Sequence, residues 1–469
     1  MTSPTRVHVL TLGCARNEVD SDELAGRLAT GGFELVDEPG DAEAVLVNTC
    51  GFIDAAKQDS INTLLEASRL KSGGVTKAVV AVGCMAERYG RELADALPEA
   101  DAVLGFDAYA DIATRVDAIL HGAKPEAHVP RDRRELLPLT PVARPRAAVG
   151  VEVPGHAPAS GPILIRRRLG SGPMAPLKIA SGCDRRCAFC AIPRFRGSYL
   201  SRPVEEIVNE ARWLVNQGVK EVFLVSENTS SYGKDLGDPR ALETLLRGLA
   251  DVDGLEWVRL SYLQPAEVKP SLLETMFSTA KVLPYFDLPF QHASASVLRR
   301  MRRFGDPDSF LALIEKIRSY DPQAGIRSNV IVGFPGETDA DVDTLKDFLV
   351  AARLDVVGVF AYSDEETTEA VDLDGHVDDD EIEFRRETVA DLALMLNEER
   401  ATERVGESVQ ALVESYEDDT WTGRTAQQGP DDGVTRVSGE ARALAVGDIV
   451  TCVVTDSEGI DLTAVPGEL

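Results

Sequence analysis

Three cysteines within eight residues are the most distinctive chemical feature of this chain. Cys183, Cys187 and Cys190 stand in the segment SGCDRRCAFC with the spacing CxxxCxxC. Thiolates at these spacings can bind three corners of a cubane [4Fe–4S] cluster, whereas a structural zinc ion or a fully ligated cluster takes four protein ligands. No fourth cysteine lies nearby, so one metal position stays open. An open position is typical of catalytic metal sites, where a substrate or cofactor becomes the last ligand.

A zinc ion is the alternative occupant of this motif. Its fourth ligand would come from elsewhere, and His292 is a candidate. A single histidine so far along the chain is a weak candidate, but the spacing alone does not exclude it. A non-catalytic iron–sulfur binding protein is a further alternative, and an analysis of bound iron and sulfide would separate it from a zinc module.

Three more cysteines end apolar segments in the first part of the chain. Cys14, Cys50 and Cys84 close the segments VHVLTLGC, AVLVNTC and KAVVAVGC. Strands that alternate with helices form a parallel sheet, and ligands collect at the carboxyl ends of its strands. We therefore expect these three cysteines to converge on one site. The strands are predicted over 7–14, 44–50, 77–84 and 101–106, and the helices over 19–30, 53–70, 86–96 and 107–120.

The same alternation resumes from Leu177 to about residue 400. Six strands with helices between them predict a partial barrel of the TIM type, in which catalytic groups lie at the carboxyl ends of the strands. Short alternating strands with Gly and Asp turns then predict a small β-barrel, and Cys452 in its apolar run IVTCVV is predicted to pack in the core. The six strands are predicted over 177–181, 221–225, 256–261, 285–288, 326–332 and 356–360. The predicted domains are an α/β domain at 1–122, a Pro- and Gly-rich linker at 123–175, the partial barrel at 176–400 and the β-barrel at 401–469.

Charge and composition narrow the class of protein. The 469 residues carry 78 acidic and 49 basic side chains, a formal net charge of −29. This balance argues against a surface that binds phosphate backbone throughout, and it favours a basic partner. No apolar stretch is long enough for a membrane span, and the first residues lack the apolar core of a signal peptide. An odd number of cysteines, seven, fits a reducing cytoplasm better than a disulfide framework.

The CxxxCxxC motif, with Phe189 just before its third cysteine, resembles the radical S-adenosylmethionine (SAM) enzymes. In that superfamily the open iron binds SAM, which is cleaved to methionine and a 5′-deoxyadenosyl radical. The resemblance implies that SAM contacts come from VSENTSSYG, DLPFQHAS and VIVGFPGET, at the ends of the second, fourth and fifth strands. With Phe189 of the cysteine motif, the cofactor-binding residues that it implies are Ser226, Glu227, Asn228, Gln291, His292, Gly333 and Gly336.

Over nearly its whole length the chain resembles the methylthiotransferases, in particular through LGCARNEVDSDELAGRL and NTCGFIDAAKQDSI. The resemblance implies that Cys14, Cys50 and Cys84 hold a second [4Fe–4S] cluster, which carries or delivers sulfur. It also implies that the β-barrel is a TRAM domain that binds the substrate. One SAM would methylate the sulfur and another would generate the radical. Both clusters need electrons, so a flavodoxin- or ferredoxin-like donor is implied.

Two branches of that family differ in substrate. One modifies an adenosine of tRNA, and the other modifies the β-carbon of an aspartate in the small-subunit ribosomal protein S-twelve. Residues 401–469 hold 14 acidic and 4 basic side chains, and the insert Asp364–Glu383 holds 11 acidic side chains and no Lys or Arg. An acidic surface suits a basic ribosomal protein and repels tRNA, so we expect the protein substrate.

Local sequence agrees with that branch. The segments LDVVGVFAYSDEE and LGCARNEVDSDEL both resemble it. There are two departures: Thr367 stands where the branch usually has glycine, and Glu227 replaces a more usual glutamine. We expect the first to change only the local loop, while the second places a carboxylate where the branch has an amide.

Overall fold

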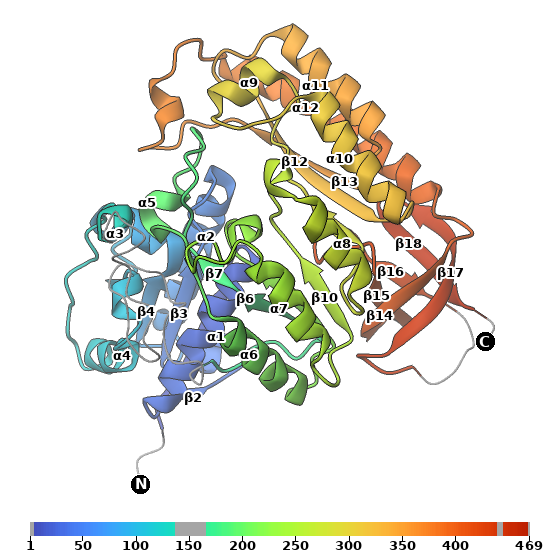
Figure 1. The fold of residues 1–469 in the computed structure, drawn as a ribbon. Coiled ribbons are helices and arrows are strands. Elements are labelled where there is room, and N and C mark those ends of the chain that lie inside the picture. The colour runs from blue at the N-terminus through green and yellow to red at the C-terminus, as the bar shows by residue number, and fades with distance from the viewer. Residues whose placement is uncertain (1–3, 137–165, 439–443, 468–469) are drawn as a thin grey trace. The chain divides into compact units, whose positions relative to one another are not determined.

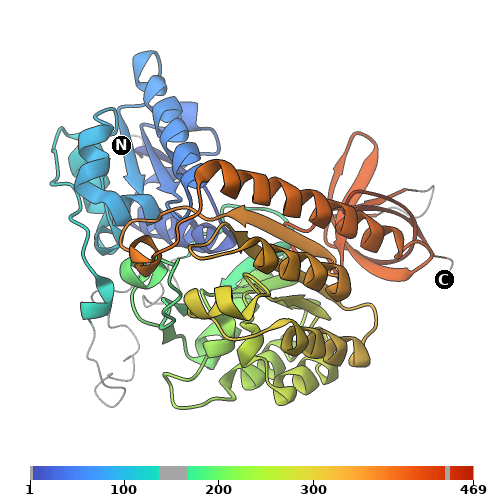
Figure 2. The ribbon, with the colours of Figure 1, turned by 90° about the horizontal axis from the view of Figure 1, so that it is seen from above.

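The structure is a computed structural model that describes residues 4–136, 166–438 and 444–467. Figures 1 and 2 show the ribbon from two directions. The chain divides into two compact units. The first comprises Met1–Ser171, Lys178–Arg185 and Cys190–Arg202, and the second comprises Gly172–Leu177, Arg186–Phe189 and Pro203–Leu469. Much of the predicted linker, 137–165, lies outside the described residues. Among the described helices, none has the length and apolar character needed to cross a membrane.

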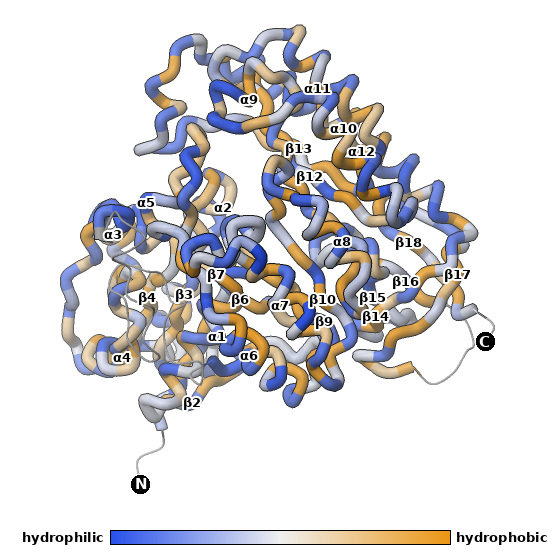
Figure 3. The backbone as a smooth tube through the Cα atoms, in the orientation of Figure 1, coloured by the Kyte–Doolittle hydropathy of each residue, from blue (hydrophilic) through white to orange (hydrophobic). Residues whose placement is uncertain are grey.

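The first unit is built on a five-stranded parallel sheet with the strand order β2-β1-β3-β4-β5. Every residue of β3 (AVLVNT) and β4 (AVVAV) is buried, as expected for central strands that are covered on both faces. Figure 3 shows the hydrophobic colouring of these strands. The elements are β1 Arg6–Thr11, α1 Ala15–Thr30, β2 Glu34–Leu35, β3 Ala44–Thr49, α2 Asp54–Arg69, β4 Ala78–Val82, α3 Gly83–Ala96, β5 Ala102–Val103 and α4 Ile112–Leu120.

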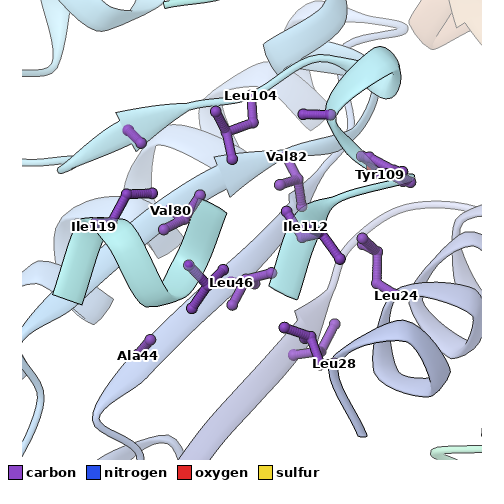
Figure 4. Close-up of a cluster of buried hydrophobic side chains, with 14 of the residues drawn as sticks. Leu24, Leu28, Ala44, Leu46, Val80, Val82, Leu104, Tyr109, Ile112 and Ile119 are labelled. Carbon is purple, nitrogen blue, oxygen red and sulfur yellow. The ribbon is translucent and has the colours of Figure 1, made fainter. Parts of the chain in front are cut away.

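Helices cover both faces of this sheet. Figure 4 shows one face, where Leu24 and Leu28 of α1 and Ile112 of α4 pack with Leu46 and Val80 of the sheet. Helices α2 and α3 pack on the other face through a second set of buried apolar residues. The three layers fix the carboxyl ends of the strands, from which the chain passes into the helices.

The predicted strands of this unit are confirmed, but they end earlier than predicted. Strand β1 stops at Thr11 and β4 stops at Val82. Glycines in the left-handed region turn the chain there, Gly13 at φ 88° and Gly83 at φ 90°. The two-residue strand β2, parallel to β1, was not predicted because it is too short to show a period.

Six parallel strands with intervening helices form the partial barrel. They lie in two three-stranded sheets, β10-β9-β6 and β11-β12-β13. The first strand begins three residues earlier than predicted, and the other five match the prediction closely. The strands are β6 Met174–Lys178, β9 Glu221–Val225, β10 Trp257–Leu260, β11 Tyr285–Asp287, β12 Gly325–Val332 and β13 Val356–Ala361. The helices are α6 Val204–Asn216, α7 Ala241–Ala250, α8 Pro270–Ser278, α9 Ala295–Arg300, α10 Pro307–Tyr320, α11 Asp339–Ala352 and α12 Asp379–Thr402.

Helix α12 packs along β13, the edge strand of the second sheet, as Figure 2 shows. Three short elements flank the cysteine motif in the first unit: β7 Ala180–Ser181, α5 Ile192–Arg196 and β8 Leu200–Ser201. Strands β7 and β8 pair antiparallel.

The predicted β-barrel is confirmed as a closed barrel with the order β14-β15-β16-β18-β17. Cys452 is fully buried in its core, as predicted. Within the second unit, buried arginines tie the barrel to the parallel strands: Arg424 Nη2 lies 2.8 Å from Glu221 Oε2, and Arg259 Nη1 donates to Ala426 O at 2.8 Å. The strands are β14 Ser408–Glu417, β15 Thr420–Thr425, β16 Thr435–Val437, β17 Ile449–Glu458 and β18 Asp461–Pro466.

Candidate functional site

The three cysteines of the first unit stand at successive strand–helix junctions. Cys14 is the N-cap residue of α1, Cys50 follows β3, and Cys84 lies in the first turn of α3. The charges of Cys14 and Cys50 both act to raise the pKa of Cys84, so the three thiols lie within electrostatic reach of one another. That the three thiols share one site stays a prediction.

Three thiols are the donor set of a [4Fe–4S] cluster that keeps one iron open. Across the described ranges, no group of three or more His, Cys, Asp or Glu side chains is arranged to hold one metal ion. In a [4Fe–4S] cluster each thiolate binds a different iron, so the ligands stand further apart than around one ion. Exposure falls from Cys14, which is exposed, to Cys84, which is buried, so the site opens to solvent on one side.

Hydrogen bonds to backbone hold these junctions in place. Asn17 Nδ2 donates to Leu12 O at 2.8 Å and to Thr49 O at 3.3 Å, which ties the ends of two neighbouring strands together. Ser60 Oγ accepts from Cys50 N at 3.0 Å and donates to Cys50 O at 2.8 Å. Such bonds fix the ligand loops before a metal arrives.

A buried charge network borders the site. Arg196 Nη2 donates to Cys84 Sγ at 2.9 Å, and its Nη1 donates to Asp20 Oδ2 at 2.8 Å. Lys178 Nζ bonds the other carboxylate oxygen of Asp20 at 2.9 Å. Burial alone would raise the pKa of Asp20, but Lys178, Arg196 and Arg16 together hold it well below its usual range. Asp20 is therefore an anion that orients Arg196.

Burial also controls the ionisation of the thiols. It raises the pKa of Cys84 to about 12 against the opposing effect of Arg196, and it raises the pKa of Cys50. Without metal both thiols are protonated at neutral pH, so metal binding must release protons.

The CxxxCxxC motif divides between the two units. Cys183 and Cys190 belong to the first unit and Cys187 to the second. In the first unit, Cys183 N donates to Gly197 O at 3.0 Å, and Arg185 N donates to Cys183 Sγ at 3.4 Å. These bonds shape the loop at the first thiol.

The part of the loop that belongs to the second unit is anchored by backbone bonds. Ala188 N donates to Met301 O at 3.1 Å, and Ala188 O accepts from Ala370 N at 2.9 Å. Phe189 is half-buried and packs on the apolar cluster around Ala188. Arg303 Nη1 lies 3.9 Å from Cys187 Sγ, so a cation stands beside this thiol.

The residues after the second strand, β9, form a compact polar turn. Ser226 and Asn228 are buried and Glu227 is half-buried. Asn228 Nδ2 donates to Ser231 Oγ at 2.8 Å, while its buried Oδ1 has no partner within the described residues. An unpartnered buried acceptor of this kind is suited to a ligand's ammonium group.

His292 and Gly333 both contact Glu337, which Arg385 of α12 binds. His292 is fully buried; its Nδ1 accepts from Ser294 N at 2.9 Å, and its Nε2 lies 3.2 Å from Glu337 Oε2. Glu337 Oε1 in turn accepts from Gly333 N at 2.8 Å. This arrangement gives His292 a structural role in holding the glycine-rich loop.

Steric contacts explain why glycine occupies positions 333 and 336. Gly333 has φ 79°, and a Cβ there would lie 2.6 Å from Ile382 Cγ1 of α12. Gly336 has φ 84°, and a Cβ there would lie 2.6 Å from Arg300 Nε. Gln291 also adopts a positive φ, 72°, which marks strain in the loop that follows β11. The SAM contacts of these residues stay predictions.

Three family models match the chain in the predicted order. The uncharacterized protein family UPF0004 matches residues 6–105, the radical SAM superfamily matches 177–349, and the TRAM domain matches 405–466. Curated relatives match the chain from end to end. The ribosomal protein uS12 methylthiotransferase RimO of Cutibacterium acnes is 64% identical over 98% of both chains, and that of Streptomyces coelicolor is 56% identical over 99% of this chain and 97% of the relative.

This chain belongs to the RimO family of methylthiotransferases. The predicted family, its fold class and its type of enzyme are confirmed. As a radical SAM enzyme of the RimO family, the protein uses SAM and [4Fe–4S] clusters.

A solved structure supports the fold independently. The radical SAM methyltransferase TsrM from Kitasatospora setae, solved with tryptophan and a SAM analogue, has a TM-score of 0.52 and 16% identity. The match covers 76% of this chain and 73% of TsrM. At this identity the likeness concerns the fold alone.

Sequence reasoning named all six cysteines but missed the charged residues beside them. Arg196, Asp20 and Lys178 are distant in sequence and carry no motif. Only the density of polar residues in ARNEVDSDEL, unusual for a helix that covers a sheet, is a sequence signal of this network.

Proposed function

We propose that this protein transfers a methylthio group to the β-carbon of an aspartate in ribosomal protein uS12, the protein named S-twelve above. The identity of 64% over 98% of both chains to a uS12 methylthiotransferase carries the proposal. The acidic insert and β-barrel support it, because a basic ribosomal protein is attracted by the surface that would repel tRNA.

Each set of three cysteines has its own role. Cys183, Cys187 and Cys190 hold the cluster at which SAM binds, and Cys14, Cys50 and Cys84 hold the second cluster. When bound, the clusters supply the electron that cleaves SAM and the site from which sulfur is delivered. The chain itself contributes the fixed junctions, the cation of Arg303 beside Cys187 and the polar turn at Asn228, which suits the SAM ammonium.

The partners follow from this chemistry. Electrons come from a flavodoxin- or ferredoxin-like protein, and the reducing, ribosome-containing cytoplasm is the compartment in which the enzyme acts. In the proposed division of labour, 1–122 carries the second cluster, 123–175 links the domains, 176–400 cleaves SAM and 401–469 binds the substrate.

Paired variants test the two roles. With the reconstituted enzyme, SAM, a reductant and purified uS12, Cys187→Ala should form no 5′-deoxyadenosine and no product. Cys50→Ala should still cleave SAM but leave uS12 unmodified. Product from Cys50→Ala, or SAM cleavage by Cys187→Ala, would contradict the assignment. Modification of purified tRNA in place of uS12 would keep the chemistry and overturn the substrate.

A further inference from the structure

We infer that Arg196 is a positioning residue of the second cluster site: it donates a hydrogen bond to the Cys84 sulfur and, by its charge, makes the bound cluster easier to reduce. This inference rests on the proposed ligand set Cys14, Cys50 and Cys84. It concerns a residue outside every cysteine motif, at the end of a short helix that follows CxxxCxxC in the chain.

The guanidinium of Arg196 is fixed in place. It is 2% exposed, and its Nη2 lies 2.9 Å from Cys84 Sγ and 3.1 Å from Asn17 Oδ1. Its Nη1 lies 2.8 Å from Asp20 Oδ2, which Lys178 holds from the other side. Because both terminal nitrogens make hydrogen bonds, the guanidinium is held in one orientation, in which an N–H points at the Cys84 sulfur.

The surroundings make this contact strong. The guanidinium lies over the ring of Phe106 at 4.8 Å from its centroid, and Phe106 is itself buried. Water is excluded from this side of the sulfur, so the charge is poorly screened. A hydrogen bond from a charged donor in such a place is stronger than one at the surface.

The hydrogen-bond pattern suits a ligating sulfur. A protonated Cys84 donates to Asn17 Oδ1 across 3.5 Å, but a thiolate bound to iron only accepts hydrogen bonds. Arg196 is a donor that such a sulfur can keep. Hydrogen bonds and positive charge at cluster sulfurs stabilise the reduced, more negative state and so raise the reduction potential.

Arg196 also connects two ligand loops of the first unit. Helix α5 begins two residues after Cys190, and Gly197, which ends it at φ 83°, accepts the hydrogen bond from Cys183 N at 3.0 Å. Consecutive residues therefore contact Cys84 and Cys183. One short segment sets the position of a ligand in each cysteine set.

The test uses the full-length chain with Cys183, Cys187 and Cys190 all replaced by alanine, so that bound iron reports on the second site. In this background Arg196→Met removes the charge and the donor at similar volume. Arg194→Met is the matched control, because Arg194 lies on the same helix and is exposed. The readouts are iron per chain after reconstitution and the midpoint potential from an EPR-monitored redox titration, with circular dichroism to check the fold.

We expect Arg196→Met to move the midpoint potential to more negative values. It should also weaken iron binding by about 10-fold, as does the loss of a hydrogen-bond partner of a metal-ligating side chain. Arg196→Lys keeps the charge but lacks the planar guanidinium, so its midpoint potential should lie between those of Arg196→Met and the parent. Arg194→Met should have the midpoint potential of the parent. If Arg196→Met matches Arg194→Met in potential, the inference is wrong. If Arg196→Met does not fold, Arg196→Gln, which keeps an N–H donor but removes the charge, takes its place, and a potential equal to that of the parent overturns the inference. If the parent itself binds no iron, the proposed ligand set fails as well.

Discussion

Thr367 holds a backbone conformation that normally belongs to glycine. Its φ is 71°, and the family resemblance places a glycine at this position. The left-handed backbone that glycine favours is thus present under a β-branched side chain, which costs about 1–2 kcal/mol of strain. The departure noted in the sequence leaves a strained residue in the loop.

Thr367→Gly should therefore stabilise the protein by about 1 kcal/mol. The strain that is released in the folded state is larger than the cost of the greater conformational entropy that glycine gives the unfolded chain. Thermal unfolding of the purified protein measures this. Thr368→Gly is the control; its φ is −88°, so glycine brings no relief there and should destabilise. Equal shifts of both variants would show that the backbone of Thr367 is not strained.

The buried thiol of Cys84 makes the stability of the metal-free protein depend on pH. Its pKa is raised by burial from about 9 to about 12, so the unfolded chain ionises before the folded one. The stability that comes from keeping this thiol protonated is complete below about pH 9 and is lost as pH rises toward 12.

Denaturant unfolding of the metal-free protein between pH 7 and 11 tests this effect. The free energy of unfolding should fall with pH above about 9, and it should fall less in Cys84→Ser. Cys452→Ser is a poor control because that thiol is also buried, so the exposed Cys14→Ser is the matched comparison. A pH profile that Cys84→Ser leaves unchanged would contradict the assignment.

At the scale of elements, the glycine-rich loop after β12 depends on the helix that packs against it. Gly333→Ala adds both a left-handed alanine and a clash with Ile382 of α12. Gly406 has a similar φ, 90°, but open space around its Cβ position. Gly406→Ala should therefore cost about 1–2 kcal/mol from the backbone alone, and Gly333→Ala about 1–3 kcal/mol more.

Denaturant unfolding of the two variants measures this difference. Gly333→Ala should also weaken SAM binding, because the same loop is held by Glu337 and His292. Equal destabilisation by the two substitutions would mean that α12 moves aside freely.

Elements were the most predictable part of this protein. Apolar runs such as AVLVNT and AVVAV are buried on both faces, and their pattern predicts central strands. Because parallel strands run in the same direction, the cysteines that follow them are predicted at the same edge of the sheet. Helix starts were harder, because Gly83 opens α3 earlier than its periodicity suggests. The contact of buried His292 with Glu337, 45 positions later, was not predicted, because no local pattern reveals it.

At the scale of the molecule, pairs between distant segments decide the assembly, and these were not predictable. Arg424 and Glu221 are 203 residues apart, yet both are buried in the second unit at 2.8 Å. Nothing in the sequence around either residue distinguishes it from a surface charge. Burial makes the loss of either partner costly, although Glu221 also pairs with Arg259 and Arg424 also pairs with Glu414.

Arg424→Met should accordingly destabilise the second unit by about 1–3 kcal/mol, because Glu221 and Glu414 lose a shared hydrogen-bond partner while Arg259 still neutralises Glu221. Arg436→Met, in the same barrel, removes a partly exposed pair with Asp461 and should cost less than about 1 kcal/mol. Calorimetry of both variants compares them. If Arg424→Met is as mild as Arg436→Met, the barrel is not held through this ion pair.

The acidic balance of the whole molecule underlies the choice of substrate, and mass spectrometry tests that choice most directly. The measurement covers uS12 peptides and tRNA nucleosides from a strain that lacks this gene, beside the same strain with the gene restored. We predict that the aspartate of uS12 loses its methylthio group, that tRNA is unchanged, and that the intact gene but not its Cys187→Ala form restores the modification. Loss of methylthio-adenosine from tRNA, with uS12 still modified, would contradict the proposed function.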